Sequence, residues 1–126
     1  MTLDNLNKII NILLELKFTL IGAEGLDNIA RLLNDTKKNG VKGAFVEAGV
    51  WRGGACIFAR SLMDHLEIKE PVYVCDSFQG LPIPMDINDV KDTNFYIPEL
   101  SVSLNTVKEN FGYFPLEGEV KYIEGL

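Results

Sequence analysis

No run of lysine and arginine occurs in this chain of 126 residues, whose 12 basic side chains face 18 acidic ones for a net charge of −6. Proteins that bind nucleic acid through its phosphates need clustered positive charge, so this composition argues against a nucleic-acid partner. Long apolar runs are missing too. The longest, Ile9 to Leu14, is interrupted by Asn11 and is too short to cross a bilayer, so we expect no membrane partner.

The sequence also shows no pattern typical of a secretory leader or of a zinc site. The start of the chain lacks a basic segment and a small-residue cleavage site, so we expect a cytoplasmic protein. Cys56 and Cys75 have no partner at zinc spacing, and we expect both to be reduced and buried as small apolar side chains. The single histidine, His65, lies near a predicted helix end, where a solvated or capping role is expected.

Apolar periodicity divides the chain into two helices followed by alternating strands and helices. Spacings of three and four predict helices, and short continuous apolar runs predict strands buried on both faces. Gly22 and Gly25 separate the first two helices, and candidate caps are Thr2 and either Ser101 or Ser103. The expected helices are 3–14, 26–40, 54–66 and about 104–111, and the expected strands are 43–49, 71–76 and 119–126.

This order of elements predicts an α/β protein with right-handed crossovers between parallel strands. The expected sheet has the spatial order 3-2-1, which is one half of a doubly wound, Rossmann-like domain. We therefore divide the chain into an N-terminal helical segment, residues 1–40, and a cofactor-binding half-domain, residues 41–126. The long stretch 79–100 contains prolines and aspartates and predicts a functional loop.

The segment FVEAGVWRGGACIFAR, residues 45–60, places a glycine turn between a strand and a helix. A phosphate-binding loop would end in Gly-Lys-Ser/Thr, and a dinucleotide site would show the spacing G-x-G-x-x-G, but neither pattern is present. Glu47 at the strand end argues against both, because its carboxylate would repel a pyrophosphate by about 1 kcal/mol or more. A nicotinamide dehydrogenase is therefore disfavoured.

A cationic ligand reverses the sign of that interaction. S-adenosylmethionine has a positive amino group and sulfonium but no phosphate, and its carboxylate suits backbone N–H groups at a helix start. Asp76 ends the next strand, where nucleoside-binding folds place an acid that accepts both ribose hydroxyls. Together, Glu47 and Asp76 predict an adenosyl cofactor. In the alternative interpretation, the glycines only permit close packing and Glu47 pairs with Arg52.

The segments FVEAGVWRGGACIFAR and VCDSFQGLP (residues 74–82) together resemble the macrocin O-methyltransferase (TylF) family. TLIGAEGLDNIARLL (19–33) and LSVSLNTVKENFGYF (100–114) are also similar to family segments, so the resemblance covers nearly the whole chain from about Thr19 and corresponds to the family's N-terminal part. The resemblance implies a Rossmann-like fold, S-adenosylmethionine as methyl donor, and a small-molecule acceptor with a sugar hydroxyl. It also implies a divalent metal, usually magnesium, that positions the acceptor.

Roles for single residues around the glycine turn follow from the resemblance as well. Glu47, Gly49 and Gly53 would hold the methionine end of the cofactor. Asp76 would take the ribose hydroxyls, with Ser77 beside it.

Three further residues would complete the cofactor pocket on the same grounds. Thr19 and Ile21 would lie against the cofactor from the junction of the first two helices. Gly125 would line the adenine pocket, although Leu126 stands where the family usually has an aromatic residue.

The strands that carry the family's metal ligands and proton-accepting residues have no counterpart in this sequence. Catalytic residues are therefore unknown, and no metal ligand is assigned. Three acidic side chains of the loop are interpreted as part of a solvated lid rather than as metal ligands: Asp86, Asp89 and Asp92. We expect a sugar-type O-methyltransferase truncated to its cofactor-binding half and inactive alone. The alternative is a non-catalytic nucleoside-cofactor-binding or partner-completed half-domain.

The first strand would have an unpaired edge in such a half-sheet. Residues 44–48 are largely apolar and contain neither proline nor lysine, which commonly protect edge strands. We therefore expect self-association through this strand, or binding to a completing chain.

Overall fold

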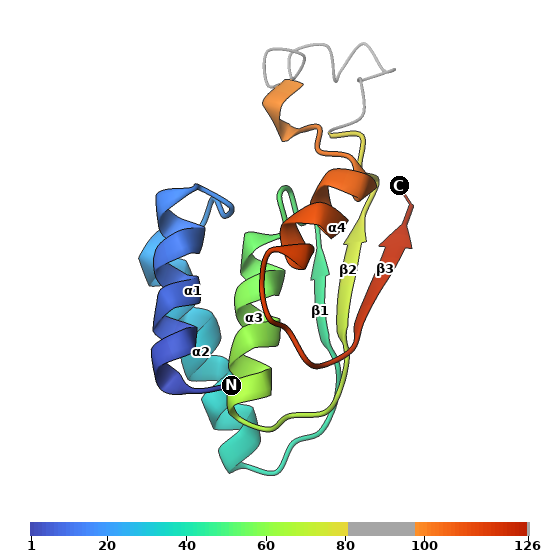
Figure 1. Cartoon of the computed structure of the whole chain (residues 1–126). Helices are drawn as coiled ribbons and strands as arrows, with labels where there is room; N and C mark the ends of the chain where they lie inside the picture. Colours follow the sequence, from blue (N-terminus) through green and yellow to red (C-terminus); the bar gives the residue numbers. More distant parts are fainter. Residues whose placement is uncertain (81–97, 126) are drawn as a thin grey trace.

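The computed structural model describes residues 1–80 and 98–125. Two helices precede an alternation of strands and helices, as Figure 1 shows. The helices are α1 (Leu3–Glu15), α2 (Gly22–Lys38), α3 (Gly54–His65), the short 3-10 helix η2 (Pro98–Leu100) and α4 (Leu104–Gly112). The strands are β1 (Phe45–Ala48), β2 (Val72–Asp76) and β3 (Val120–Glu124). Asp86, Asp89, Asp92 and Leu126 lie outside the described residues, so the interpretation of the acidic loop stays a prediction.

Side-chain caps begin two of the helices. The Thr2 hydroxyl accepts a hydrogen bond from the Asn5 N–H at 3.1 Å and begins α1, as predicted. Of the two candidate serines, Ser103 begins α4. The expected break at Gly25 is wrong, because α2 already starts at Gly22 and contains Gly25. A Cβ on Gly25 would lie within 2.6 Å of the Ile21 side chain, so this glycine allows close packing inside the helix.

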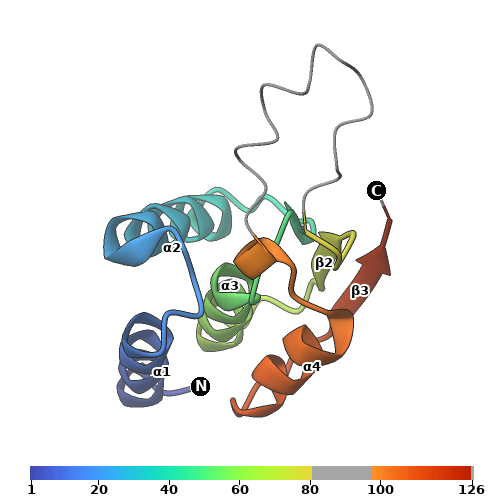
Figure 2. The ribbon, with the colours of Figure 1, turned by 90° about the horizontal axis from the view of Figure 1, so that it is seen from above.

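The strands form a parallel sheet in the order β1-β2-β3, which confirms the predicted α/β topology. Figure 2 shows the helices on one side of this sheet. Side chains alternate accordingly, and Val46 of β1 is 61% exposed on the other side. The expectation that β1 is buried on both faces is therefore wrong, since among the described residues the helices cover only one face.

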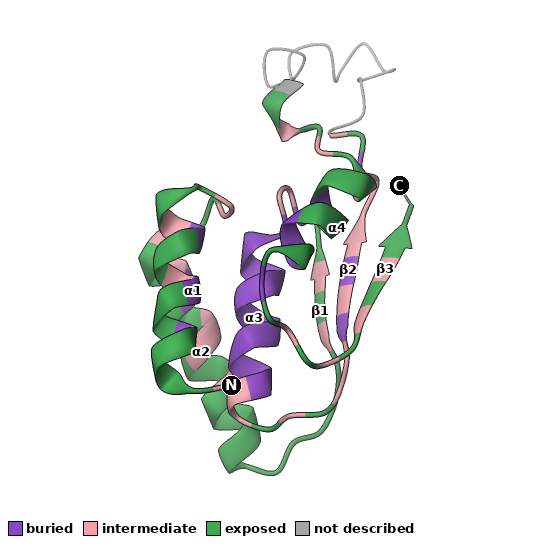
Figure 3. Cartoon of the chain, in the orientation of Figure 1, coloured by how far each residue is buried: buried purple, intermediate pink, exposed green. Residues whose placement is uncertain are grey.

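Helix α3 lies at the centre of the core, and Figure 3 shows it buried almost throughout. It packs on the sheet, and α1 and α2 pack on it in turn. Leu13 of α1 and Leu26 of α2 therefore belong to the same buried cluster as Ile57 of α3 and Val74 of β2. Among the described residues, no helix combines the length and apolar character that crossing a membrane would require.

The two cysteines and the single histidine lie on α3 and β2. Cys56 is fully buried in α3, as predicted, whereas Cys75 is half-buried, so the prediction is wrong for Cys75. Cys75 lies on β2 between the inward-facing Val74 and Asp76, and alternation turns it toward the uncovered face of the sheet. His65 ends α3 with its Nδ1 2.8 Å from the Met1 carbonyl oxygen, which ties the start of the chain to α3.

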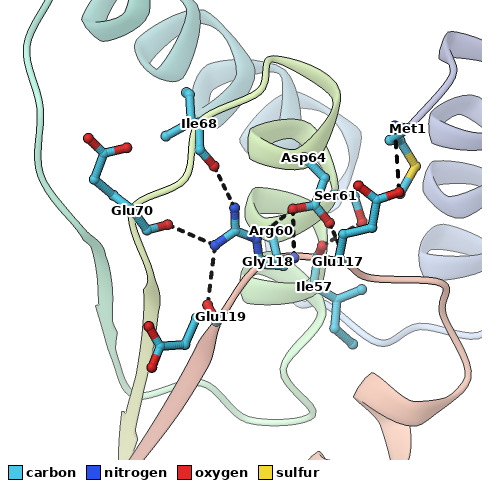
Figure 4. A network of polar contacts seen from close by, with 10 residues as sticks. All are labelled: Met1, Ile57, Arg60, Ser61, Asp64, Ile68, Glu70, Glu117, Gly118 and Glu119. Carbon is cyan, nitrogen blue, oxygen red and sulfur yellow. Dashed lines mark hydrogen bonds and ion pairs between the residues drawn. The ribbon is translucent and has the colours of Figure 1, made fainter.

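A buried ion pair within α3 joins this helix to two later segments of the chain (Figure 4). Arg60 is fully buried, and its Nε lies 3.0 Å from an Asp64 carboxylate oxygen one helical turn later. Its Nη1 donates to the backbone carbonyls of Glu70 and Glu119, and its Nη2 donates to that of Ile68. One side chain thus connects the end of α3, the entry of β2 and the entry of β3.

Asp64 extends this network to the segment before β3. Its carboxylate oxygens accept the backbone N–H groups of Glu117 at 2.8 Å and Gly118 at 3.0 Å. A Cβ on Gly118 would lie within 2.2 Å of the Arg60 guanidinium, so glycine is required for this close approach. Within the described residues, every buried polar side-chain atom has a hydrogen-bond partner.

Candidate functional site

A cavity of about 400 Å³ opens where the carboxyl ends of the three parallel strands meet. This is the edge at which open α/β sheets bind ligands. Its walls come from all three strands and the turns that follow them: Ala48, Gly49, Cys75, Asp76, Ser77, Ile123 and Gly125. The structure thus brings together Gly49, Asp76, Ser77 and Gly125, four of the residues singled out from the sequence.

The glycine turn after β1 depends on backbone conformations that favour glycine. Gly49 has φ +85° and Gly53 has φ +89°, both in the left-handed region. The Gly49 N–H donates to the Cys75 carbonyl at 2.8 Å, which holds the start of the turn against β2. Gly53 is the residue before α3, and it directs the chain into that helix. The turn therefore brings the N-terminus of α3 to the ligand edge of the sheet.

Asp76 is held between two turns. One carboxylate oxygen accepts the Val50 N–H at 2.8 Å, and the other accepts the Phe78 N–H at 3.0 Å. A carboxylate has about four lone-pair positions, so both oxygens keep capacity for further donors such as ribose hydroxyls. Ser77, the next residue, donates from its hydroxyl to the Gly80 carbonyl at 3.1 Å. It shapes the turn that follows β2.

Glu47 lies on the helix-covered face of β1 and is half-buried. Burial raises the pKa of its carboxyl to about 7, and the negative charge of Asp76 adds to the rise, while a hydrogen bond from the Cys56 thiol opposes it. Near neutral pH this carboxyl is therefore partly protonated, and a nearby cation would favour its ionised form.

Arg52 bonds to a different part of the chain from the one that the alternative interpretation expected. Its Nη1 donates to the Lys17 carbonyl at 3.1 Å, and its guanidinium lies 4.4 Å from the centre of the Trp51 ring. No ion pair joins it to Glu47 among the described residues, so the alternative of a Glu47–Arg52 pair is wrong.

The junction of α1 and α2 runs beside the glycine turn. The Gly54 N–H donates to the Phe18 carbonyl at 2.9 Å, which brings this junction to the first residue of α3. Thr19 follows, and its hydroxyl accepts the Ile21 N–H at 3.2 Å. Four of the predicted site residues do not line the cavity, so their contact with a cofactor stays a prediction: Thr19, Ile21, Glu47 and Gly53.

Sequence reasoning missed part of the wall. Ala48, Cys75 and Ile123 line the cavity because each lies in the last two residues of its strand. Their positions near the ends of the predicted strands could have identified them as wall residues. Trp51 and Phe78 lie in the turns after β1 and β2 and have a left-handed backbone. Nothing in the sequence indicated this, because bulky side chains rarely adopt that conformation.

The family model described as macrocin-O-methyltransferase (TylF) matches residues 13–126. A mycinamicin III 3''-O-methyltransferase of Micromonospora griseorubida is 36% identical over 115 residues, which are 85% of this chain and 45% of that protein. A demethyldecarbamoylnovobiocin O-methyltransferase of Streptomyces niveus is 36% identical over 113 residues, which are 85% of this chain and 43% of that protein. The chain thus spans less than half the length of these curated relatives.

Solved structures show the same fold. The O-methyltransferase NovP superimposes with a TM-score of 0.83 at 28% identity, over 95% of this chain and 62% of that one. The calicheamicin methyltransferase CalS11 superimposes with a TM-score of 0.61 over 97% of this chain and 56% of its own, and its 18% identity supports the fold alone.

Proposed function

Because this chain belongs to the macrocin O-methyltransferase family, we propose that it holds S-adenosylmethionine at the carboxyl ends of β1 and β2. In this proposal residues 41–126 are the cofactor-binding part of an enzyme that methylates a hydroxyl of a sugar-containing small molecule. The observation that carries it is the cavity lined by both Gly49 and Asp76. Glu47 lies outside the cavity wall, and its carboxyl is near enough to Asp76 for the two charges to interact.

The residues present fit the chemistry of this cofactor. Asp76 has lone pairs left for the ribose hydroxyls, and Ala48 and Ile123 provide apolar wall beside it. The Glu47 carboxyl would accept the cofactor's ammonium group, and backbone N–H groups after Gly53 would face its carboxylate. When bound, the cofactor would supply an electrophilic methyl group. The chain's own residues would bind and orient it.

The described residues offer no comparable set of ligands for magnesium. Within residues 1–80 and 98–125, no three metal-binding side chains gather as a possible set of ligands. The magnesium that family resemblance implies therefore has no place in the proposed chemistry of these residues. A non-catalytic cofactor-binding module remains the second candidate. Methyl transfer by the isolated 126 residues would exclude it, and we expect none.

A pH series of titrations with S-adenosylhomocysteine tests the proposed cofactor. That ligand has the ammonium group but no transferable methyl group. Below pH 7 the Glu47 carboxyl must release its proton to pair with the ammonium, so binding is weakened by protonation. We expect the affinity to rise up to about tenfold per pH unit as the pH approaches 7 and to level off above it.

Two variants identify the carboxyl responsible. Glu47→Gln should bind more weakly at pH 8 and lose the pH dependence below pH 7, since its amide does not ionise. Glu124→Gln is the matched control, because Glu124 lies opposite Asp76 in the sheet register and is exposed. It should keep the wild-type profile. Absence of measurable binding at every pH, or an unchanged slope in Glu47→Gln, would contradict the proposal.

We also propose that the outer edge of β1 pairs with a strand of a second copy or of a completing chain. The Gly49 N–H donates to Cys75 of β2 and the Phe45 N–H to Pro71 just before it. Val46 and Ala48 therefore direct their backbone groups away from β2. No strand pairs with that edge among the described residues. A groove of about 660 Å³ lies along it, with apolar walls that include Leu32, Val41 and Met63.

Sedimentation across a concentration series tests this edge. We expect wild type to associate, and Val46→Lys to shift the equilibrium toward monomer, because a charge on an edge strand disfavours pairing. Ile123→Lys is the matched control, since Ile123 is exposed on the same sheet face but on β3. A monomer at all concentrations, or equal effects of the two lysines, would show that the β1 edge is not the contact.

A further inference from the structure

Four non-glycine residues in the described chain have a left-handed backbone: Lys17, Trp51, Glu67 and Phe78, with φ between 51° and 59°. Lys17 and Glu67 follow the ends of α1 and α3, where such a residue commonly closes a helix through hydrogen bonds to its last turn. Trp51 and Phe78 follow no helix. They lie in the turns after β1 and β2, and these are the turns that border the cavity.

A left-handed backbone is unfavourable for bulky side chains, so it persists only where surrounding contacts hold it. Phe78 is buried, and the Trp51 Nε1–H donates to the Glu99 carbonyl at 2.9 Å. These contacts hold each side chain separately. They do not connect the two turns to each other.

Asp76 makes that connection. Its Oδ2 accepts the N–H of Val50, the residue immediately before Trp51, at 2.8 Å. Its Oδ1 accepts the N–H of Phe78 itself at 3.0 Å. A single carboxylate therefore holds one strained turn with each oxygen, and no other side chain in the described residues bonds to both turns.

We propose that Asp76 is a positioning residue that holds the turns after β1 and β2 in the shape that forms the cavity. This role is present before any ligand binds and is additional to the ribose contact, and its link to cofactor binding rests on the proposed function. Losing the carboxylate would release both turns together. It would then weaken binding through the cavity's shape as well as through the missing ribose contact.

Ligand-free protein tests the role directly, because Trp51 is the single tryptophan of the chain and reports on its own turn. In Asp76→Ala we expect a shifted Trp51 emission and easier quenching by acrylamide. Native-state exchange of the Val50 and Phe78 amides should accelerate by about tenfold or more relative to the Gly49 amide, which bonds to Cys75 instead. Glu124→Ala, opposite Asp76 in the β2–β3 register, is the matched control and should change none of these signals.

Two further variants separate positioning from general loss of stability. Asp76→Asn keeps one acceptor oxygen, so one of the two amides should remain protected while the other exchanges faster. Trp51→Gly removes the strain in the first turn, since glycine accepts a left-handed backbone. In that background, Asp76→Ala should lower the melting temperature less than it does in wild type. Equal losses in both backgrounds would overturn the inference.

The outcome for the turns is independent of the outcome for the cofactor. Unchanged Trp51 emission and unchanged Val50 and Phe78 exchange in Asp76→Ala would overturn the positioning role, even if S-adenosylhomocysteine binding is lost. Released turns in Asp76→Ala support it, whether or not wild type binds that ligand. Failure of wild type to bind would count against the proposed function alone. If Asp76→Ala does not fold, the selective protection expected in Asp76→Asn decides the question.

Discussion

Replacing Arg60 by methionine is expected to lower the free energy of unfolding by about 3–5 kcal/mol, the usual cost of removing one partner of a buried ion pair. The variant would leave the Asp64 carboxylate buried without its charge partner. It would also leave the carbonyls of Ile68, Glu70 and Glu119 without the guanidinium that joins them in Figure 4. Against a total stability of about 5–15 kcal/mol for a domain, this loss is severe.

Urea unfolding measures the effect, and an exposed arginine supplies the control. Among the described residues, the exposed Arg31 on α2 bonds only to Asn28 one turn earlier, so Arg31→Met should change stability by about 0.5 kcal/mol or less. The double variant Arg60→Met/Asp64→Leu should recover part of the loss, because it removes the unpaired charge. The recovery should be incomplete, since the Glu117 and Gly118 N–H groups lose their acceptor. Similar losses for Arg60→Met and Arg31→Met would refute the structural role of the pair.

Gly54→Ala is expected to destabilise the protein by about 2–4 kcal/mol, through overpacking and a weakened hydrogen bond. A Cβ at this position would lie within 2.3 Å of the Phe18 carbonyl oxygen, which also accepts the Gly54 N–H. Because the obstacle is backbone, it cannot move aside as a side chain would. Either the α1–α2 junction or the start of α3 must shift, and both adjoin the candidate site.

Gly112→Ala provides the matched control for that substitution. Gly112 ends α4, and apart from its chain neighbours and its own helix backbone, no atom of the described residues lies within 4 Å of its hypothetical Cβ. Alanine there should be neutral or stabilising by up to about 1 kcal/mol. Thermal unfolding of the two variants, followed by circular dichroism, gives the comparison. If Gly54→Ala melts like Gly112→Ala, the close packing at the α3 start is not required.

Local patterns were sufficient for the order of the elements. Apolar spacing, the Thr2 cap and the glycine turn act over a few residues. Right-handed crossovers on one face of the sheet then give the order β1-β2-β3 for three consecutive parallel strands. The same rules led to the prediction that Glu47 and Asp76 belong to one ligand site, because the carboxyl ends of parallel strands lie at one edge of the sheet.

The wrong expectations came from treating local patterns as evidence about distant neighbours. The continuous apolar run of β1 indicated burial on both faces, yet Val46 is exposed, since the described helices all lie on one side. Glu47 and Arg52 are close in sequence, but Arg52 reaches Lys17 at the end of α1 instead. Neither outcome is encoded within a few residues.

The sequence by itself determined the parallel α/β order, the family resemblance and the place of Asp76 at a strand end, because these depend on residue type and spacing. Only the tertiary structure decided what Asp76 and Arg60 bond to. Asp76 reaches the amides of two separate turns, and Arg60 reaches carbonyls before two separate strands. Backbone N–H and C=O groups are the same at every non-proline position, so only folding selects which of them a buried charge meets.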